Sequence, residues 1–248
     1  MSELAIIGGT GLTTLKNLEI VKREVVHTPF GEPSGPLTHG VMSGRQVVFL
    51  ARHGHGHTIP PHRINYRANI WALHNTGVKK VIAVAAVGGI ADDLRPGMLA
   101  IPDQIIDYTA ARESTFFADG LSHVTHIDFT DPYCEELRQV LINACALTKL
   151  DFVPRGTYAT TEGPRLETAA EVERMARDGC AMVGMTGMPE AALARELELC
   201  YATCAVVVNK AAGRGTGPIT MQEIEQTVNR GMEKVRMLLE NVVTLLKS

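Results

Sequence analysis

The stretch VVFLARHGHGHTIPPHR, residues 47–63, combines an apolar run with a polar loop that follows it at once. The run at 47–51 contains no polar residue, which is typical of a strand buried on both faces. An arginine and three histidines at alternate positions come next. In α/β proteins, ligands bind outside the carboxyl ends of the strands. The stretch therefore predicts an α/β fold and indicates that a site lies at the strand ends.

Short apolar runs alternate with longer amphipathic stretches along the rest of the chain, which is the pattern of βαβ units. With 248 residues, 45% of them hydrophobic, the chain suits a single domain covering residues 1–248. Thr220 and Glu223 have the spacing of a capping box at the start of the last helix. A polar and aromatic segment at 109–129 is long enough to cover a site. We expect strands at 4–7, 47–51, 81–87, 98–101, 156–160, 182–185 and 201–208, and helices at about 65–74, 132–149, 168–178, 189–196 and 220–247.

The composition narrows the class of partner. Charged residues make up 21% of the chain and the net charge is −3, so no basic surface is expected to attract nucleic acid or an anionic membrane. A small molecule is the expected partner. The chain has no stretch of ~18 apolar residues and no basic segment before an apolar one, so we expect a cytoplasmic protein. The cysteines are odd in number and contain no Cys-x-x-Cys pair, and we expect buried, reduced thiols at Cys134, Cys145, Cys180, Cys200 and Cys204.

Two glycine-containing turns follow predicted strands. GGTG at 8–11 can direct backbone amides toward an anion, and Thr10 adds a hydroxyl. The pair Gly88-Gly89 leaves a second stretch of bare backbone after the third strand. Neither turn has the G-x-G-x-x-G spacing of a dinucleotide site. Together the two turns indicate a phosphate rather than a nicotinamide cofactor.

The histidine run allows two interpretations. His-x-His at a strand end is how metal-dependent hydrolases of the amidohydrolase type begin, but no histidine follows His126 to complete such a site. In the second interpretation, Arg52 and His53 form an anion clamp, because a guanidinium offers a planar fork of donors that fits phosphate. The pattern favours the anion clamp and no metal, with a metal-dependent hydrolase as the alternative. The other histidines are then loop residues, namely His55, His57 and His62.

Six motifs, in this order along the chain, resemble those of the trimeric purine nucleoside phosphorylase and methylthioadenosine phosphorylase family. They are IIGGTGL (6–12), ARHG (51–54), AVGGI (86–90), GPRLET (163–168), GMTGMPEA (184–191) and VVVNKAA (206–212). The resemblance implies one α/β domain with a central mixed sheet flanked by helices, and a homotrimer with sites near the subunit contacts. It also implies phosphorolysis, in which phosphate displaces a purine from ribosyl C1′. Inorganic phosphate is then a co-substrate, and no cofactor is expected.

The resemblance assigns residues to the phosphate and the ribose. Met185 matches the methionine that packs under the sugar. The family places Thr or Asn where this chain has Ala85, so one side-chain contact to phosphate is missing. The reaction requires that phosphate be held below the sugar while charge develops on the purine. The positions that match the family's phosphate site are Thr10, Arg52, His53, Thr186 and the backbone amide of Ala86.

Two residues address the base. Family members that act on 6-oxopurines carry Asn at the position of Asn209 and Glu at the position of Glu167, whereas those selective for 6-aminopurines carry Asp at the first position. A carboxylate can accept from N1–H of hypoxanthine, and an amide can donate toward O6 or N7 as the base departs. We expect the catalytic set to be His53, Glu167 and Asn209. Leu166 lies where an aromatic residue commonly stacks on the base.

The resemblance also assigns residues at the start of the last helix to the 5′ end of the sugar. Met221 occupies the position where phosphorylases of ordinary nucleosides have a histidine, and a thioether packs well on another thioether. Ile219 and Ile224 would line the same apolar pocket, and His126 matches a histidine that reaches in from a neighbouring subunit. An alternative is that Met221 belongs only to the buried face of the helix.

The resemblance therefore implies phosphorolysis of S-methyl-5′-thioinosine. A general 6-oxopurine nucleoside phosphorylase acting on inosine and guanosine, or a methylthioadenosine phosphorylase, would differ only in one of the two pockets. A purine-binding protein without activity is a further alternative.

Overall fold

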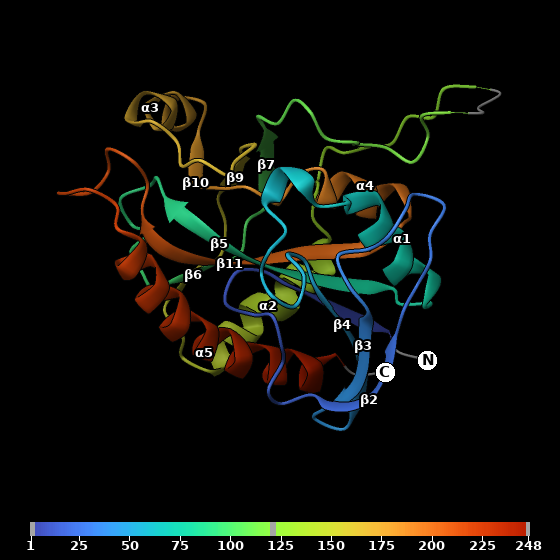
Figure 1. Ribbon diagram of the computed structural model, residues 1–248. Coiled ribbons are helices and arrows are strands. Elements are labelled where there is room, and N and C mark those ends of the chain that lie inside the picture. The colour runs from blue at the N-terminus through green and yellow to red at the C-terminus, as the bar shows by residue number, and fades with distance from the viewer. Residues whose placement is uncertain (1–2, 120–122, 247–248) are drawn as a thin grey trace.

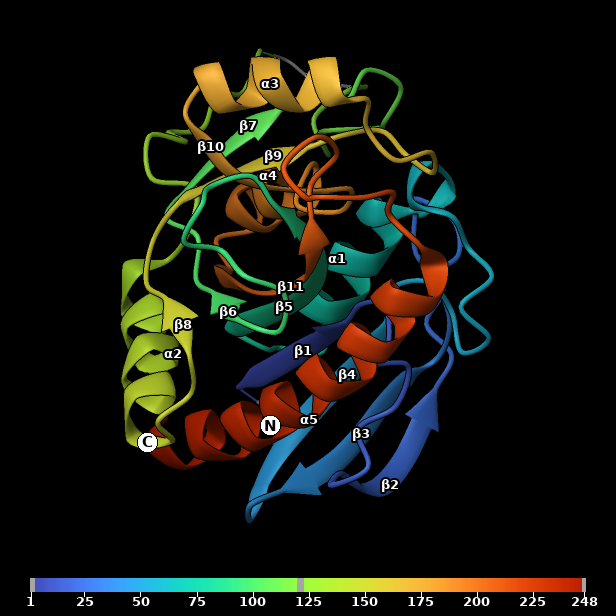
Figure 2. The same cartoon turned by 90° about the vertical axis from the view of Figure 1, so that its left-hand side faces the viewer.

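The computed structural model describes residues 3–119 and 123–246, and its centre is one mixed β-sheet with helices on both faces (Figure 1). Helices α2 (Glu135–Leu147) and α5 (Met221–Leu245) pack on one face, and α5 crosses in front of the sheet in Figure 2. Helices α1 (Tyr66–Asn75) and α4 (Glu190–Glu196) cover the other face. Helix α3 (Ala169–Arg177) packs against one end of the sheet. The predicted α/β architecture with a mixed sheet is confirmed.

The sheet contains eleven strands within the described residues. Eight of them lie in the order β2-β3-β4-β1-β5-β10-β9-β7, and β11 joins the sheet through β5 and β6. The strand bounds are β1 Leu4–Gly8, β2 Glu19–Glu24, β3 Leu37–Met42, β4 Arg45–Ala51, β5 Lys80–Gly89, β6 Leu99–Ala100, β7 Gln104–Asp107, β8 Phe152–Val153, β9 Thr157–Thr160, β10 Cys180–Gly184 and β11 Cys200–Lys210. A short 3-10 helix, η1 (Pro61–Arg63), precedes α1.

Along one edge of β5, the pairing strand changes from β1 to β10. Strand β1 runs parallel to β5 as far as Ala83, whereas β10 pairs antiparallel with β5 only from Gly88 onward. Backbone groups of a strand alternate between its two neighbours. The N–H of Lys80 points to the β1 side, where it donates to Glu3 O, so the backbone groups of Val84 and Ala86 point to that side too. No strand pairs with the stretch 84–87 on this edge within the described residues. An opening in the sheet thus exposes main-chain donors and acceptors.

The predicted strands are all present, but the sequence did not indicate four others. β2 is almost fully exposed and carries charged side chains, so it has no apolar run to reveal it. β7 and β8 are only four and two residues long, too short to show a period. β3 continues the sheet from β4 through an antiparallel connection. β3 is mostly buried, but a histidine and a glycine interrupt its run LTHGVM. Sequence periodicity therefore finds uninterrupted apolar runs and misses strands that are short, exposed or interrupted.

The predicted capping box at the start of α5 is only half formed. Thr220 Oγ1 accepts from the backbone N–H of Glu223 at 3.3 Å, but the Glu223 carboxylate accepts the Thr220 hydroxyl at 2.8 Å instead of reaching the backbone of Thr220. A complete capping box occurs at α3, where Thr168 and Glu171 each bond to the other's backbone N–H. Both helices still begin within a residue of the predicted position.

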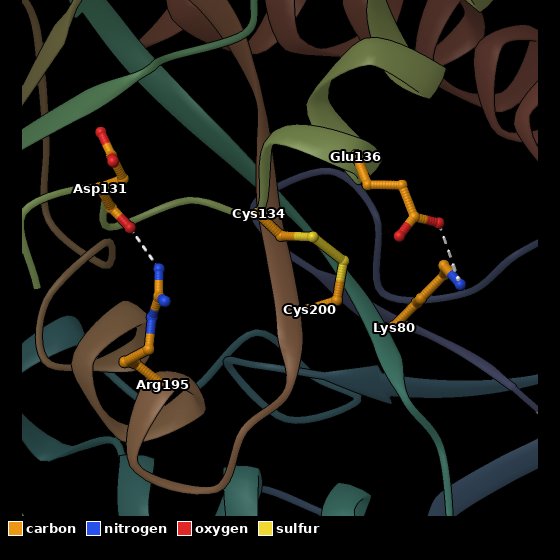
Figure 3. The surroundings of a disulfide bond; sticks show 6 residues. All are labelled: Lys80, Asp131, Cys134, Glu136, Arg195 and Cys200. Atoms are coloured by element: carbon orange, nitrogen blue, oxygen red, sulfur yellow. Dashed lines mark hydrogen bonds and ion pairs between the residues drawn. A yellow bond between two sulfur atoms is a disulfide. The ribbon is translucent and has the colours of Figure 1, made fainter. Parts of the chain in front are cut away.

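The prediction that all five cysteines are reduced is wrong for two of them. Cys134 and Cys200 form a disulfide (Figure 3). They are 66 residues apart in sequence, but the residue before α2 and the first residue of β11 are brought together, and Cys134 N–H donates to Tyr201 O at 2.8 Å. Tertiary pairing of this kind leaves no mark in the cysteine spacing. The other three, Cys145, Cys180 and Cys204, are free and buried as predicted.

The segment at 109–129 has no helix or strand in its described part, and Figure 1 shows the loop between β7 and α2 extending away from the body of the molecule.

No helix within residues 3–119 and 123–246 is long and apolar enough to cross a membrane.

Candidate active site

Three of the residues predicted to bind phosphate, Thr10, Arg52 and His53, follow β1 and β4, which are neighbours. Gly8 pairs with Ala51, so the turn that carries Thr10 and the residue Arg52 leave the sheet side by side. The turn needs glycine here, because a Cβ on Gly9 would lie 3.0 Å from Arg52 Nη1 and 2.4 Å from the Val84 carbonyl oxygen. Thr10 Oγ1 lies 3.1 Å from His57 Nε2. The glycine turn and the start of the histidine loop therefore form one wall.

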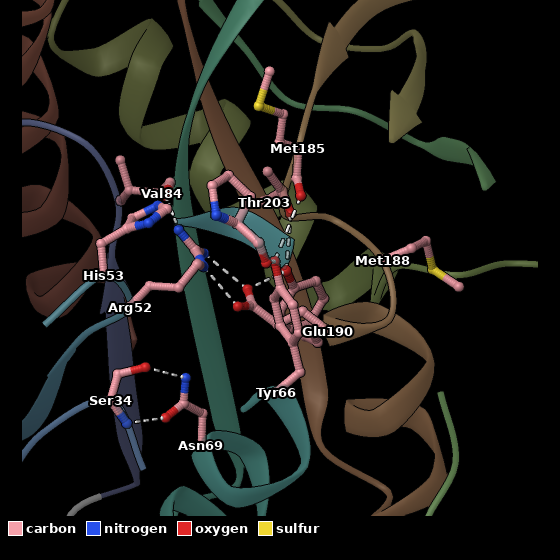
Figure 4. A network of polar contacts seen from close by, with 12 residues as sticks. Ser34, Arg52, His53, Tyr66, Asn69, Val84, Met185, Met188, Glu190 and Thr203 are labelled. Carbon is pink, nitrogen blue, oxygen red and sulfur yellow. Dashed lines mark hydrogen bonds and ion pairs between the residues drawn. The ribbon is translucent and has the colours of Figure 1, made fainter. Parts of the chain in front are cut away.

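Arg52 is buried, with only 1% of its surface exposed, and its guanidinium is already paired (Figure 4). Nε donates to Glu190 Oε2 at 2.7 Å, Nη2 donates to Oε1 at 2.8 Å, and Nη1 donates to the Val84 carbonyl at 2.8 Å. Burial alone would lower the pKa of Arg52, but the Glu190 carboxylate more than offsets this and raises it above its ordinary value. A guanidinium has five N–H bonds, so one on each Nη nitrogen is left for a ligand.

His53 is buried next to Arg52. Its Nδ1 lies 2.8 Å from the Ile59 carbonyl oxygen, and since a carbonyl only accepts, Nδ1 carries the proton. Burial, followed by the charge of Arg52, lowers the pKa of His53 to about 4. The imidazole is therefore neutral at neutral pH, and the lone pair of its Nε2 can accept a hydrogen bond from a protonated phosphate oxygen. The predicted anion clamp thus consists of a paired arginine and a neutral histidine.

The remaining histidines of the loop, His55, His57 and His62, are exposed. Among the residues that the structure describes, no three His, Cys, Asp or Glu side chains gather in a way that could hold a metal ion. The geometry thus gives no support to the hydrolase interpretation of the HGHGH run.

Thr186 and Met185 follow β10, which borders the opening beside β5. Thr186 is buried, and Val183 pairs with Gly88, so the end of β10 passes Ala86. A Cβ on Gly163, whose φ is +63°, would lie 2.5 Å from Met185 Sδ. The loop that carries the GPRLET motif is thereby packed on the methionine assigned to the ribose. Ala86 offers its N–H on the same edge where Val84 accepts from Arg52, whereas Ala85, which precedes it, is buried.

The two residues assigned to the base line different clefts. Glu167 accepts from Thr161 Oγ1 at 2.6 Å and borders a cleft of about 250 Å³. Asn209, opposite Gly88 in the sheet, donates through Nδ2 to the Lys210 carbonyl at 2.6 Å. It borders a second cleft of about 510 Å³, together with Val208, Lys210, Ile219, Thr220 and Ile224 among others.

The 5′ residues are only partly brought together. Ile219 and Ile224 share the cleft of Asn209, but Met221 does not line it and is 65% exposed. The alternative that places Met221 on the buried face of α5 is therefore wrong. Leu166 is 41% exposed, and His126 is exposed on the loop that extends away from the sheet.

Sequence reasoning missed two residues that organise the site. Glu190 lies in the GMTGMPEA motif, and the signal that could have revealed it is an acid within the otherwise apolar start of α4. Arg112 has no such signal. Its Nη2 donates to the carbonyls of Thr161 at 3.1 Å and Glu162 at 2.8 Å, and its Nη1 donates to the Met188 carbonyl at 2.5 Å. Arg112 thereby ties the covering segment to the loops that follow β9 and β10.

Known proteins resemble this chain in sequence and in fold. The family model described as the phosphorylase superfamily matches residues 3–244. A probable S-methyl-5′-thioinosine phosphorylase of Pseudomonas syringae pv. tomato is 56% identical over 98% of this chain and 99% of its own. A 6-oxopurine nucleoside phosphorylase of Pyrococcus furiosus is 47% identical over 99% of this chain and 94% of its own. The solved structure of methylthioadenosine phosphorylase from Schistosoma mansoni in complex with adenine superposes with a TM-score of 0.94 at 32% identity, covering 99% of this chain and 92% of that one.

Because the family model and these relatives match the chain over almost its whole length, the protein belongs to the phosphorylase superfamily.

Proposed function

We propose that the protein is a pentosyltransferase that cleaves S-methyl-5′-thioinosine with inorganic phosphate, giving hypoxanthine and 5-methylthioribose 1-phosphate for purine salvage. The observation that carries the proposal is the shared cleft of Asn209 with Ile219 and Ile224. A polar base reader and an apolar wall in one cleft suit a nucleoside whose 5′ group is apolar. The relative from Pseudomonas syringae, whose name gives the same activity, supports this choice.

In this proposal, phosphate lies in the opening beside β5. Its donors are the Thr10 and Thr186 hydroxyls, the two remaining N–H bonds of Arg52, and the Ala86 amide. His53 Nε2 accepts a hydrogen bond from a protonated phosphate oxygen. Fixed donors hold the phosphate below C1′ at a high effective concentration, so the displacement needs no covalent intermediate.

The purine lies between Glu167 and Asn209. The Glu167 carboxylate accepts from N1–H of a 6-oxopurine, and the Asn209 amide turns from the Lys210 carbonyl to donate toward N7 as charge develops there. Met185 packs under the ribose, and Leu166 covers part of the base. Inorganic phosphate is the co-substrate, and the reaction requires no cofactor or metal.

The 5′ side is open in the single chain, because Met221 is exposed. We infer a homotrimer in which the segment at 109–129 of a neighbouring subunit closes it, with His126 and Met221 at the methylthio group, as the family resemblance implies. We propose that no nucleic acid or membrane takes part and that the reaction occurs in the cytoplasm.

A general 6-oxopurine nucleoside phosphorylase is the second candidate. The exposure of Met221 favours it, since an open 5′ side would also admit a hydroxyl. The relative from Pyrococcus furiosus carries that activity in its name.

A substrate panel separates these functions. Initial rates are measured on methylthioinosine, methylthioadenosine, inosine and guanosine, each with and without phosphate and with EDTA. We expect methylthioinosine to react fastest, only with phosphate and without loss in EDTA. Faster turnover of inosine would establish the second candidate, faster turnover of methylthioadenosine would show that the base assignment is wrong, and cleavage without phosphate would reject phosphorolysis altogether.

A further inference from the structure

Glu190, the first residue of α4, has no exposed surface, and both of its carboxylate oxygens are engaged (Figure 4). Oε2 accepts from Arg52 Nε at 2.7 Å, and Oε1 accepts from Arg52 Nη2 at 2.8 Å and from the Tyr201 hydroxyl at 2.8 Å. Fully buried carboxylates are rare unless they are paired. The three hydrogen bonds that this one accepts come from Arg52 and from a tyrosine next to it.

These contacts fix the guanidinium of Arg52 in its plane. The carboxylate holds one side of the fork, the Val84 carbonyl takes a third N–H, and the backbone of Gly9 lies against Nη1. Free rotation of the guanidinium is no longer possible without breaking two charge-assisted hydrogen bonds.

The pair also sets the charge of the phosphate pocket. The positive charge of Arg52 is matched by Glu190 at contact distance, and the neighbouring His53 is neutral. An arriving phosphate therefore meets oriented N–H and O–H groups more than a net positive field. Its binding depends on where the two remaining N–H bonds of Arg52 point.

We propose that Glu190 is a positioning residue for phosphate, which acts through Arg52 by holding the guanidinium so that one N–H of each Nη nitrogen faces the anion. The inference rests on the proposed phosphate-dependent reaction and extends it to a residue that does not itself contact either substrate. Tyr201 supports the arrangement, since burial raises the pKa of its hydroxyl well above the ordinary value and keeps it a donor.

If Glu190 positions Arg52, its substitution should change the KM for phosphate but not the KM for the nucleoside. Glu190→Asp keeps the charge but is one methylene too short to hold both contacts, and Glu190→Gln keeps the length but places an NH₂ group against an Arg52 N–H. We expect the KM for phosphate to rise about tenfold or more, the effect of one lost charge-assisted contact, in both variants. The KM for methylthioinosine should stay within about twofold of the wild type.

A matched control is available on α3. Glu173 accepts from Arg177 at 3.0 Å and from Arg214 at 2.9 Å on the surface. Glu173→Gln makes the same chemical change at an arginine contact away from the phosphate residues, and it should leave both KM values unchanged. Thermal shift with inorganic phosphate alone gives a second readout, and the stabilisation by phosphate should shrink in the Glu190 variants only.

A double-mutant cycle tests whether the effect passes through Arg52. In an Arg52→Lys background, where no fork exists to be held, Glu190→Asp should add little to the KM for phosphate. Additive effects would overturn the proposal, and so would an unchanged phosphate KM in a folded Glu190 variant or an equal rise in both KM values. Should Glu190→Gln fail to fold, Glu190→Asp still decides. Failure of the proposed function appears elsewhere, as wild-type enzyme that does not need phosphate.

Discussion

The two ends of the candidate site are built differently. At the phosphate end, Arg52 and Glu190 are buried and bonded to one another, and His53 is fixed through Ile59. At the nucleoside end, Met221 and Leu166 are exposed, and the candidate residues lie along two clefts. One chain thus completes the end assigned to the attacking group but leaves the end assigned to the substrate open. If the assignments hold, buried residues determine the reaction type, whereas the choice of nucleoside depends on side chains such as Met221 and Leu166, which are exposed and can be exchanged at little cost in stability.

The largest expected effect follows from removing the arginine side chain at the phosphate end. Arg52→Ala leaves the Glu190 carboxylate buried without its partner, which should lower the free energy of unfolding by about 3–5 kcal/mol. The KM for phosphate should rise by about one to two decades, because two ligand N–H bonds disappear with the side chain. Denaturant unfolding and phosphate titration measure the two effects.

The double variant Arg52→Met/Glu190→Leu is the control for Arg52→Ala. It should regain stability, since neither charge is left buried, but not phosphate affinity. A stable Arg52→Ala protein with an ordinary phosphate KM would remove the contrast between the two ends.

The next effect concerns pH. The pKa of His53 is lowered from 6.5 to about 4 in the folded protein, so the unfolded chain binds more protons between these values. The contribution of His53 to stability is therefore complete above about pH 6.5 and is lost as the pH falls toward 4, with a total of about 3 kcal/mol. His53→Asn, whose amide can still donate to Ile59, should lose less stability over this range. Equal losses in wild type and variant would show that the imidazole is not held neutral.

A smaller effect is expected at the base. Asn209→Asp replaces an amide donor by a carboxylate, so kcat/KM for methylthioinosine should fall about tenfold relative to that for methylthioadenosine. The Glu167 carboxylate limits the gain on the aminopurine. The ratio of the two kcat/KM values measures the change, and an unaltered ratio would mean that another residue reads the base.

The smallest effect tests the open end. Met221→His supplies a donor near the sugar 5′ position, and the preference should move toward inosine by about threefold to tenfold, the size of one solvent-exposed hydrogen bond. Met237→His is a matched control, because Met237 is an exposed methionine farther along the same helix. Equal ratios of kcat/KM for methylthioinosine and inosine in both variants would exclude Met221 from the 5′ pocket.

The contrast between the buried and the exposed end also explains which features could be predicted from the sequence. The buried strands and the residues that follow them, such as Thr10 and Arg52, were predictable because an apolar run and a strand end are local features. The partner of Arg52 was not, since Glu190 lies 138 residues away and only packing brings the two together. The same holds for the bond between Cys134 and Cys200. Met221 and His126 stay predictions, because their role depends on the homotrimer that we propose.

The opening in the sheet beside β5 has a consequence for how this site can be mutated. The N–H of Ala86 and the carbonyl of Val84 belong to the main chain, so replacing either side chain leaves both groups in place. An alanine scan therefore cannot measure the contribution of these two groups. Ala85 is an example. The related family has Thr or Asn at this position, and the amide of the neighbouring Ala86 remains even though that polar side chain is missing here. Only a proline at 86, which has no N–H, or a backbone ester would remove that donor, so Ala86→Pro is the single amino-acid substitution by which laboratory evolution can discard it.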